Sequence, residues 1–467
     1  MGERAWDSTS VRVRMGETFE GRTAAVAGCI ASLVGTLIAM MLIPSDPAAK
    51  GVLLLPALVL AGGILFVPTV RALSRSKDTL NAENFVALGF VYWILLDLIQ
   101  GGYDLYDASD QAIRYALIAI GISAASMWVG VFARPWRTPR FLVDSVSIPL
   151  ENATLVKMVF ACFFLGMSNF VYAVNFDLIE MFSYLGTARW DAPWSRGQLG
   201  GWGAFLEHTQ YFGYALPSLA ILLVVRLGWL KPECLLALAA AAIQVAFLGQ
   251  GGGRRIIGVT VGAAILVWML AQPGLKLKKM LGVGVGVVGL LLLMDFVLEI
   301  RTQGYEAYVE SGSRFDRLHV DDNFLRLAQV IEMIPDKHPF VYLQPIFFAM
   351  IRPIPRVFWE SKPVDPGFDL PSELGIEGVS LSMSIIGEWY MSFGWVALMF
   401  GGWLHGRLAS AANALREDWV LANNPIMFAL AVMVLVSGLR SMQDLVIMTY
   451  AVLAWIGVTW LIAHRPR

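Results

Sequence analysis

Two adjacent arginines, Arg254 and Arg255, follow three glycines in the stretch LGQGGGRRIIG, which lies between two long apolar runs. A planar guanidinium group binds phosphate through two parallel hydrogen bonds, and the point charge of lysine does not reproduce this. Successive glycines let backbone N–H groups approach a ligand closely, and the start of the next helix favours an anion. The stretch therefore predicts an anion-binding turn. The alternative is that both side chains extend from a helix end to lipid phosphates.

A carboxylate lies inside a later apolar run, in the stretch SLSMSIIGEWYMSFGW. Glu388 is expected about two helical turns from the outer end of this run, with Ser384 one turn before it on the same face. An ionisable residue within a membrane span is a candidate functional residue by default. Glu388 is therefore a candidate general base, and the alternative is an ion-pair partner that holds two helices together.

The segment from residue 299 to residue 381 carries further candidates. His319 and Asp322 in HVDDNFLRLAQVIEMIP are candidate bases, although an inert surface histidine and a helix cap are the alternatives. The next stretch, RPIPRVFWESKP, contains prolines that favour an extended backbone. The segment then holds three cations close to the bilayer as candidate anion ligands: Arg352, Arg356 and Lys362.

Two other groupings have a plain structural interpretation. Asp295 and Glu299 are four residues apart on one helix face with Arg301 just beyond, which suits local ion pairing at a helix end. Arg440 and Asp444 have the same spacing in the stretch RSMQD, and a structural ion pair is the leading interpretation there.

The elements that position these residues are membrane spans. Of the 467 residues, 57% are hydrophobic and 15% are charged, whereas a soluble domain has about 25% charged residues. Many stretches reach the length of about 20 apolar residues that crosses a bilayer core, and such stretches must be helical because lipid offers the backbone no partner. We expect an all-α polytopic membrane protein with about twelve spans. They cover residues 23–43, 51–70, 84–99, 113–133, 154–175, 203–225, 233–249, 255–271, 279–298, 382–403, 425–439 and 443–463.

Basic residues orient these spans. The N-terminus and every second loop carry clusters of lysine and arginine, which places both termini in the cytoplasm. The other face nevertheless holds many arginines, and this indicates an anionic ligand on the extracytoplasmic side. Besides Arg254 and Arg255 they are Arg189, Arg196, Arg301, Arg314, Arg317, Arg326, Arg352, Arg356 and Arg440.

The spans divide the chain into three parts. Residues 1–298 form a membrane domain with nine spans and the outer loop 176–202, and residues 382–467 form a second membrane part with three spans. Between them, residues 299–381 form a large extracytoplasmic loop whose length argues for a function. Its amphipathic stretch after Asp322 is expected to be an interfacial helix, with a helix packed inside the protein as the alternative.

Several of these stretches resemble bacterial oligosaccharide repeat-unit polymerases, the Wzy-type O-antigen and exopolysaccharide polymerases. The resemblance is carried by RPIPRVFWESKP, by SIIGEWYMSFG some 20 residues later, and by the GGGRR turn. Some members carry an Arg-x10-Gly motif in each of two outer loops, and Arg189…Gly200 and Arg356…Gly367 have this spacing here.

The resemblance implies a GT-C-like fold and a metal-independent glycosyltransferase with no cofactor, located in the bacterial inner membrane. Such an enzyme transfers a growing glycan from undecaprenyl or another polyprenyl diphosphate to a sugar hydroxyl of a second lipid-linked unit. The partners that the resemblance implies are the lipid-linked oligosaccharide, membrane lipids, and flippase and chain-length regulator proteins, but not nucleic acid. The diphosphate ligands are then expected among Arg189, Arg254, Arg255, Arg301, Arg352, Arg356, Lys362 and Arg440, and the catalytic groups among Glu388, His319 and Asp322.

Two other functions remain open. An O-antigen ligase of similar build would transfer finished glycan to a lipid core and would rely on a histidine of the large loop, where His319 and His338 are available. A transporter of an anionic lipid-linked or polysaccharide substrate would place ionisable residues at the membrane midplane and would show repeat symmetry. The predicted spans are mostly free of charge at their centres, and no repeat is evident. The base also stays open, since Asp321 and Glu207 are further candidates.

Overall fold

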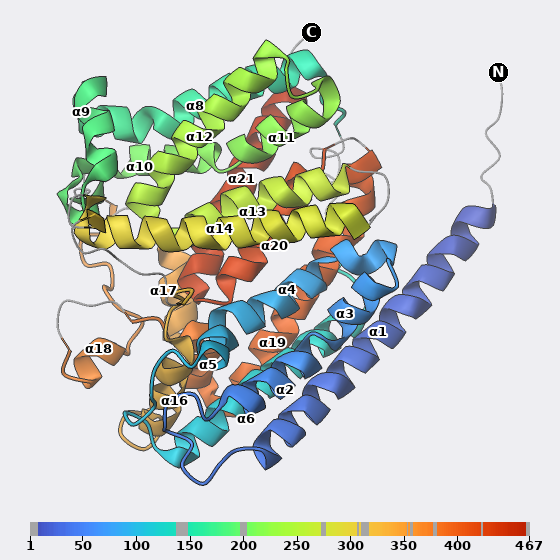
Figure 1. Cartoon of the computed structure of the whole chain (residues 1–467), viewed down its shortest axis with the longest axis vertical. Coiled ribbons are helices and arrows are strands. Elements are labelled where there is room, and N and C mark those ends of the chain that lie inside the picture. The colour runs from blue at the N-terminus through green and yellow to red at the C-terminus, as the bar shows by residue number, and fades with distance from the viewer. Residues whose placement is uncertain are drawn as a thin grey trace. The chain divides into compact units, whose positions relative to one another are not determined.

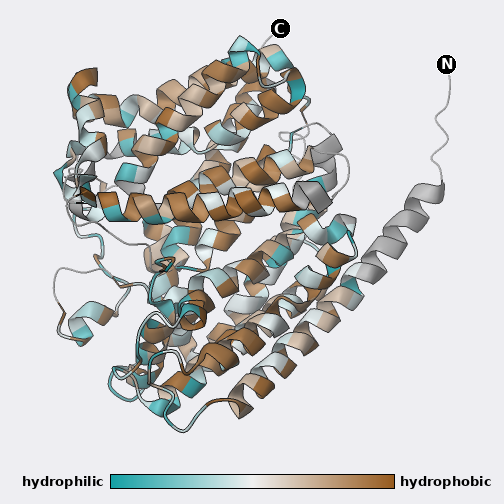
Figure 2. Ribbon diagram, viewed as in Figure 1, coloured by the Kyte–Doolittle hydropathy of each residue, from teal (hydrophilic) through white to brown (hydrophobic). Residues whose placement is uncertain are grey.

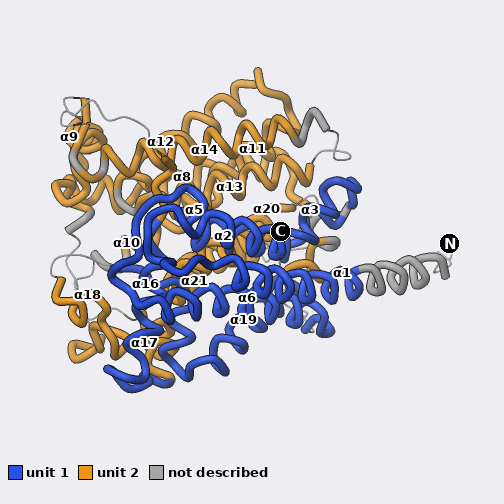
Figure 3. Tube along the Cα trace, turned by 60° about the horizontal axis from the view of Figure 1, so that its bottom comes forward, with its two compact units in different colours: residues 1–136, 321–342, 381–411 blue, residues 137–320, 343–380, 412–467 orange. Residues whose placement is uncertain are grey.

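A computed structural model describes residues 8–136, 148–196, 203–271, 277–305, 308–309, 317–352, 354, 358–376, 381–421 and 424–463. All regular elements within these ranges are helices (Figure 1). The chain forms two compact units, and each is assembled from segments far apart in the sequence (Figure 3). Unit 1 comprises residues 1–136, 321–342 and 381–411, and unit 2 comprises residues 137–320, 343–380 and 412–467.

Unit 1 is a helical bundle in which α1 packs along α6 and α2. Its helix α16 comes from the long loop that follows α14, and it packs on α6. The elements of this unit are α1 (Ser8–Met41), α2 (Leu54–Ile64), α3 (Phe66–Leu73), η1 (Lys77–Leu80), α4 (Ala82–Phe90), the π-helix η2 (Val91–Leu95), α5 (Leu96–Gln100), α6 (Asp110–Phe132), α16 (Asn323–Met333) and the greater part of α19 (Ser384–Leu421).

Seven of the described helices form the centre of unit 2. Helix α8 packs on α10, α11 packs on α12 and α13, and α20 packs on α13 and α21. A short irregular loop with α9 and three 3-10 turns joins α8 to α10. The elements are α8 (Asn152–Ala173), α9 (Leu178–Ser183), η3 (Tyr184–Gly186), η4 (Arg189–Asp191), η5 (Pro193–Arg196), α10 (Gly203–Gly213), α11 (Leu216–Leu227), α12 (Pro232–Gly252), α13 (Arg254–Leu270), α14 (Leu277–Gln303), α17 (Gln344–Ile351), α18 (Leu370–Glu373), α20 (Ile426–Gly438) and α21 (Met442–Ala463).

Eight helices within the described ranges are long and apolar enough to cross a membrane. They coincide with eight of the twelve expected spans, and hydrophobic residues run along them in Figure 2. Apolar helices of this length indicate a membrane-embedded protein. The eight are Gly21–Met41, Ala82–Gln100, Asp110–Phe132, Asn152–Ala173, Leu206–Leu227, Pro232–Gln250, Leu281–Ile300 and Met442–Ile462.

The other four expected spans have less regular structures. The span expected at 51–70 is the pair α2 and α3, bent by 60°, and counting this pair gives up to nine spans. Those expected at 255–271 and 425–439 are shorter apolar helices, Arg255–Leu270 and Ile426–Gly438. The total of twelve therefore stays a prediction.

The span expected at 382–403 is not one continuous helix. Phe393 and Gly394 have non-helical backbone angles in the middle of α19, with φ of 63° at Gly394. The backbone N–H groups of Val341 and Tyr342 donate to the carbonyls of Met391 and Ser392 at 2.9 and 3.1 Å. A segment distant in the sequence thus satisfies carbonyl groups that the break releases, as a buried helix end requires. The short first part of α19 carries Glu388.

The amphipathic helix of the large loop is α16, and its apolar face is enclosed by protein. Phe324, Leu327, Ala328 and Val330 are each 0% exposed. The apolar face of α16 is therefore buried within unit 1, and the position of this helix relative to a membrane stays a prediction.

Glycines bring α6 and the second part of α19 into contact. A Cβ atom on Gly406 would lie 1.9 Å from the carbonyl oxygen of Met127, whereas a Cβ on Gly457 in α21 would meet nothing within 4 Å. We expect Gly406→Ala to destabilise the protein by about 1–3 kcal/mol, because the two helices must separate. Thermal unfolding of the purified protein measures this, with Gly457→Ala as the matched control. Equal midpoints for the two variants would contradict the close packing.

Candidate functional site

The junction between α12 and α13 is tighter than the sequence suggests. The expected turn at 250–254 is reduced to one residue, because α12 continues through Gly252 and α13 begins at Arg254. Gly253 is buried and has φ of 80°, a backbone conformation that favours glycine. The N-terminus of α13 has no side-chain cap, and Arg255 lies in its first turn.

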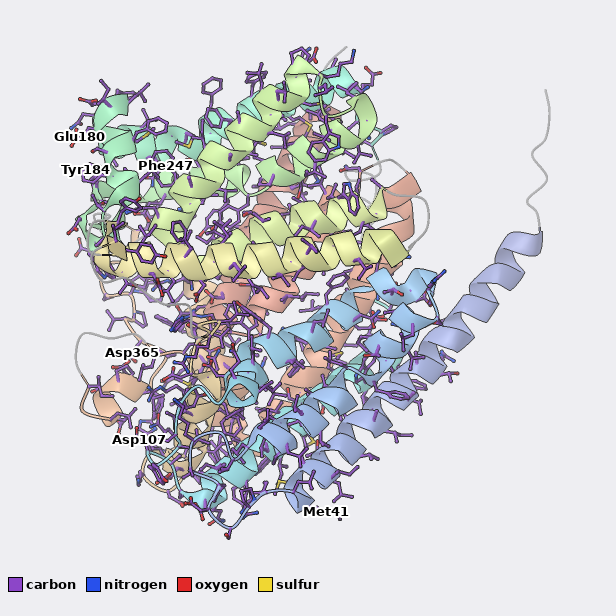
Figure 4. All side chains as sticks on the ribbon, in the orientation of Figure 1. Met41, Asp107, Glu180, Tyr184, Phe247 and Asp365 are labelled. Carbon is purple, nitrogen blue, oxygen red and sulfur yellow. The ribbon has the colours of Figure 1, made fainter. Side chains whose placement is uncertain are left out.

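The loop between α8 and α10 packs against this junction. The indole N–H of Trp194 donates to Oε1 of Gln250 at 2.6 Å, and the Trp194 ring contacts Phe170 and Phe247. Tyr184 also contacts Trp194 and donates to Oε1 of Glu180 at 3.2 Å (Figure 4). These contacts fix the loop that carries Arg189 beside the end of α12.

A buried carboxylate joins two of the predicted arginines. Asp444 is 1% exposed and accepts hydrogen bonds from Arg255 through Oδ1 and from Arg440 through Oδ2, the second at 2.9 Å. Ser441 fixes the same turn, since its hydroxyl accepts from the Asp444 backbone N–H at 3.0 Å. The expected ion pair of Arg440 is thus present, but Asp444 also pairs with Arg255, 189 positions away in the sequence.

Arg189 adds a third positive charge to this group. Burial and then the charge of Arg255 lower the pKa of the Arg189 guanidinium. Its charge also lies over the Trp190 ring, 4.7 Å from the ring centroid. Arg189 therefore lies within electrostatic range of Arg255, and the mutual repulsion of the two guanidinium groups favours a bound anion.

Three side-chain nitrogens of this group are enclosed and lack a hydrogen-bond partner. They are Nε of Arg189, Nε of Arg255 and Nε2 of Gln250. All three are donors. Buried donors without an acceptor are rare in folded proteins and commonly mark the position of a missing water or ion. This combination of excess positive charge and unused donors suits a ligand rich in acceptor oxygens.

Arg352 belongs to the same region of unit 2. Helix α17 ends at Ile351, next to Arg352, and packs on α21. The Tyr211 hydroxyl interacts electrostatically with both Arg352 and Arg255. Lys362 has a positioning role here, because its ammonium group donates to the carbonyls of Arg352 and Ile354 at 2.9 and 2.8 Å. Arg352 itself is exposed.

The motif glycine Gly367 follows in the same segment. It has φ of 88°, a left-handed backbone conformation in which any other side chain would be strained.

His319 has a partner that the sequence did not reveal. Its Nδ1 and its backbone N–H both lie 3.0 Å from Oδ1 of Asp295, which is 6% exposed. Such a carboxylate can orient an imidazole so that the opposite ring nitrogen accepts a proton. In α14, Val297 lies against Gly249 of α12, and Met294 lies against Gly258 of α13. The Asp295–His319 pair is therefore at the same end of these three helices as Arg255.

Glu299 approaches the Asp295–His319 pair. The ligand atoms of Asp295, Glu299 and His319 lie within 4.8 Å of one another, a grouping that could also hold a divalent cation. The expected absence of a metal therefore stays a prediction.

The remaining predicted residues lie elsewhere. Glu388 and Asp322 belong to unit 1, where Asp322 forms an ion pair with Arg326. Their relation to the arginines of unit 2 therefore stays a prediction. Arg356 lies outside the described residues, as do the side chains of Arg254 and Arg301.

Sequence reasoning missed Gln250, Trp194 and Tyr211. A signal existed for Gln250, since it is a polar residue at the end of an apolar run.

The sequence matches no family model, no curated protein and no solved structure at a significant level. The function is therefore inferred from the site itself.

Proposed function

We propose that this protein is a Wzy-type polymerase that joins lipid-linked oligosaccharide repeat units on the extracytoplasmic face of a bacterial membrane. The observation that carries the proposal is the group of unpaired donors at Arg189, Arg255 and Gln250 beside an excess of positive charge. A diphosphate offers several charged acceptor oxygens, and it is also the leaving group of this reaction. Donors fixed before the reaction stabilise negative charge as it develops.

The proposed reaction is a single nucleophilic displacement. A hydroxyl oxygen of the acceptor sugar forms a bond to the anomeric carbon of the donor glycan, and the bond from that carbon to the phosphate oxygen breaks. The electron pair leaves with the polyprenyl diphosphate, which Arg189, Arg255 and Arg352 would hold. The proton of the acceptor hydroxyl passes to a base, and His319, oriented by Asp295, is the candidate in unit 2.

Reconstitution with lipid-linked repeat units tests this proposal. Purified protein in liposomes should release polyprenyl diphosphate in step with the growth of a ladder of glycans that differ by one repeat unit. Heat-treated protein is the control. A substrate that crosses the bilayer without any new glycosidic bond would overturn the proposal in favour of transport.

An O-antigen ligase is the second candidate, and the Asp295–His319 pair favours it, because that reaction would rely on a histidine of this loop. The same liposomes distinguish the two functions. A ligase adds one finished glycan to a lipid-core acceptor and produces no ladder in its absence.

A further inference from the structure

A second polar region lies in unit 1, at the loop between α5 and α6. This loop contains the sequence GGYDLYDASD and is held from several directions. The backbone N–H of Leu105 donates to the carbonyl of Ala48 at 2.7 Å, and that of Ser109 donates to Oε2 of Glu332 at 2.8 Å. The loop is therefore fixed between the connection from α1 to α2 and helix α16, so its exposed side chains are presented on a rigid base.

The exposed side chains of this loop are one aromatic ring among carboxylates. Tyr106 is 66% exposed, and Asp104 and Asp107 beside it are exposed as well (Figure 4 labels Asp107). Asp322, at the start of α16, adds a further partly exposed carboxylate. This negative charge disfavours a phosphate ligand, in contrast to the arginine group of unit 2.

The layer beneath the loop contains enclosed polar atoms without a hydrogen-bond partner. They are Oδ1 of Asn323 and Nε of Arg326. Asn323 is 0% exposed, and its Nδ2 donates to the carbonyl of Trp93 at 2.9 Å. Trp93 lies in the π-helix η2, a rare element that is frequent at functional sites.

The unpaired atoms of the two regions differ in kind. At the arginine group of unit 2 the three unpaired nitrogens are all donors, whereas here a donor and an acceptor occur together. Burial and the charges of Asp97 and Asp322 raise the pKa of Tyr103, so its hydroxyl stays a neutral donor. A mixed set of this kind matches ligand hydroxyl groups, each of which both donates and accepts.

We propose that the surface formed by Asp104, Tyr106, Asp107 and Asp322 is a binding subsite for the neutral sugars of the glycan. The Tyr106 ring offers an apolar face for a sugar ring, and the carboxylates accept hydrogen bonds from its hydroxyls. Tyr103 and Asn323 supply further polar atoms beneath this surface. The inference rests on the proposed function, since that function supplies the glycan.

Binding of a lipid-free oligosaccharide tests the subsite without catalysis. The probe is the reducing oligosaccharide of one repeat unit, and saturation-transfer NMR with the purified full-length protein measures its affinity. We expect Tyr106→Ala to weaken binding at least tenfold and Tyr106→Phe to retain it, because the phenyl ring keeps the stacking face. Asp107→Asn should weaken binding less, since an amide still accepts one hydrogen bond. Trp229→Ala, which removes an exposed ring (58%) elsewhere in the chain, is the matched control.

The affinity for polyprenyl diphosphate is measured in parallel and separates the two proposals. Tyr106→Ala should bind this lipid as the wild type does. A wild type that binds the lipid diphosphate but not the oligosaccharide, or a Tyr106→Ala variant with unchanged oligosaccharide affinity, overturns the subsite and leaves the proposed function standing. In that case the unpaired atoms beneath the loop hold internal water only. A protein that binds neither probe overturns both.

Discussion

Replacing Arg255 with lysine should abolish the glycan ladder while single lipid-linked units accumulate. Lysine keeps the positive charge and can still pair with Asp444, but it cannot offer the paired N–H groups of a guanidinium to a diphosphate. Loss of one preorganised donor costs about 10²–10³ in turnover. The measurement is polymer formed per folded enzyme in reconstituted liposomes.

A purely structural role for Arg255 predicts a different result. Arg255→Lys would then lower the folded fraction, and activity per folded molecule would stay near the wild-type value. Arg114→Lys is the matched control, because Arg114 makes a single hydrogen bond at 3.2 Å to the Pro44 carbonyl in unit 1. Normal ladders from both variants would remove Arg255 from the site.

The second large effect is expected at the histidine pair. His319→Gln should reduce turnover by about 10²–10⁴, the usual contribution of a positioned general base. Asp295→Asn should reduce it too, since the amide no longer stabilises the imidazolium that forms when His319 takes the proton. Both variants should bind polyprenyl diphosphate normally, because the carboxylate that pairs with Arg255 and Arg440 is Asp444. Single-turnover kinetics at saturating lipid-linked substrate measures the loss.

Glu388→Gln provides the contrasting outcome. Glu388 lies on the short first part of α19, before the break at Phe393 and Gly394. If Glu388 is the base, its glutamine variant loses turnover and His319→Gln keeps it. If Glu388 only supports the broken helix, Glu388→Gln lowers the folded fraction and leaves specific activity unchanged. Comparing the two variants in one assay therefore decides which of the two residues is the base.

Much of the fold could be predicted because a membrane span is a local property. Length and apolar composition identified eight helices that the structure contains, with boundaries within a few residues. The departures have local geometric causes that hydropathy does not record. The break in α19 depends on one glycine with φ of 63° and on a distant segment that satisfies the free carbonyls. The bend between α2 and α3 is likewise invisible to a hydropathy average.

The site was predictable only as a set of residue types. Composition and apolar length, which are local to each stretch of the chain, were sufficient to predict helices of membrane-spanning length. Three contacts became visible only in the folded chain: Asp444 joins Arg255 to Arg440, Trp194 holds the loop of Arg189 at Gln250, and Asp295 orients His319. These partners lie on different helices or loops, and their meeting depends on how whole helices pack. Packing is set by side-chain shape over long sequence separations, so no local pattern contains it.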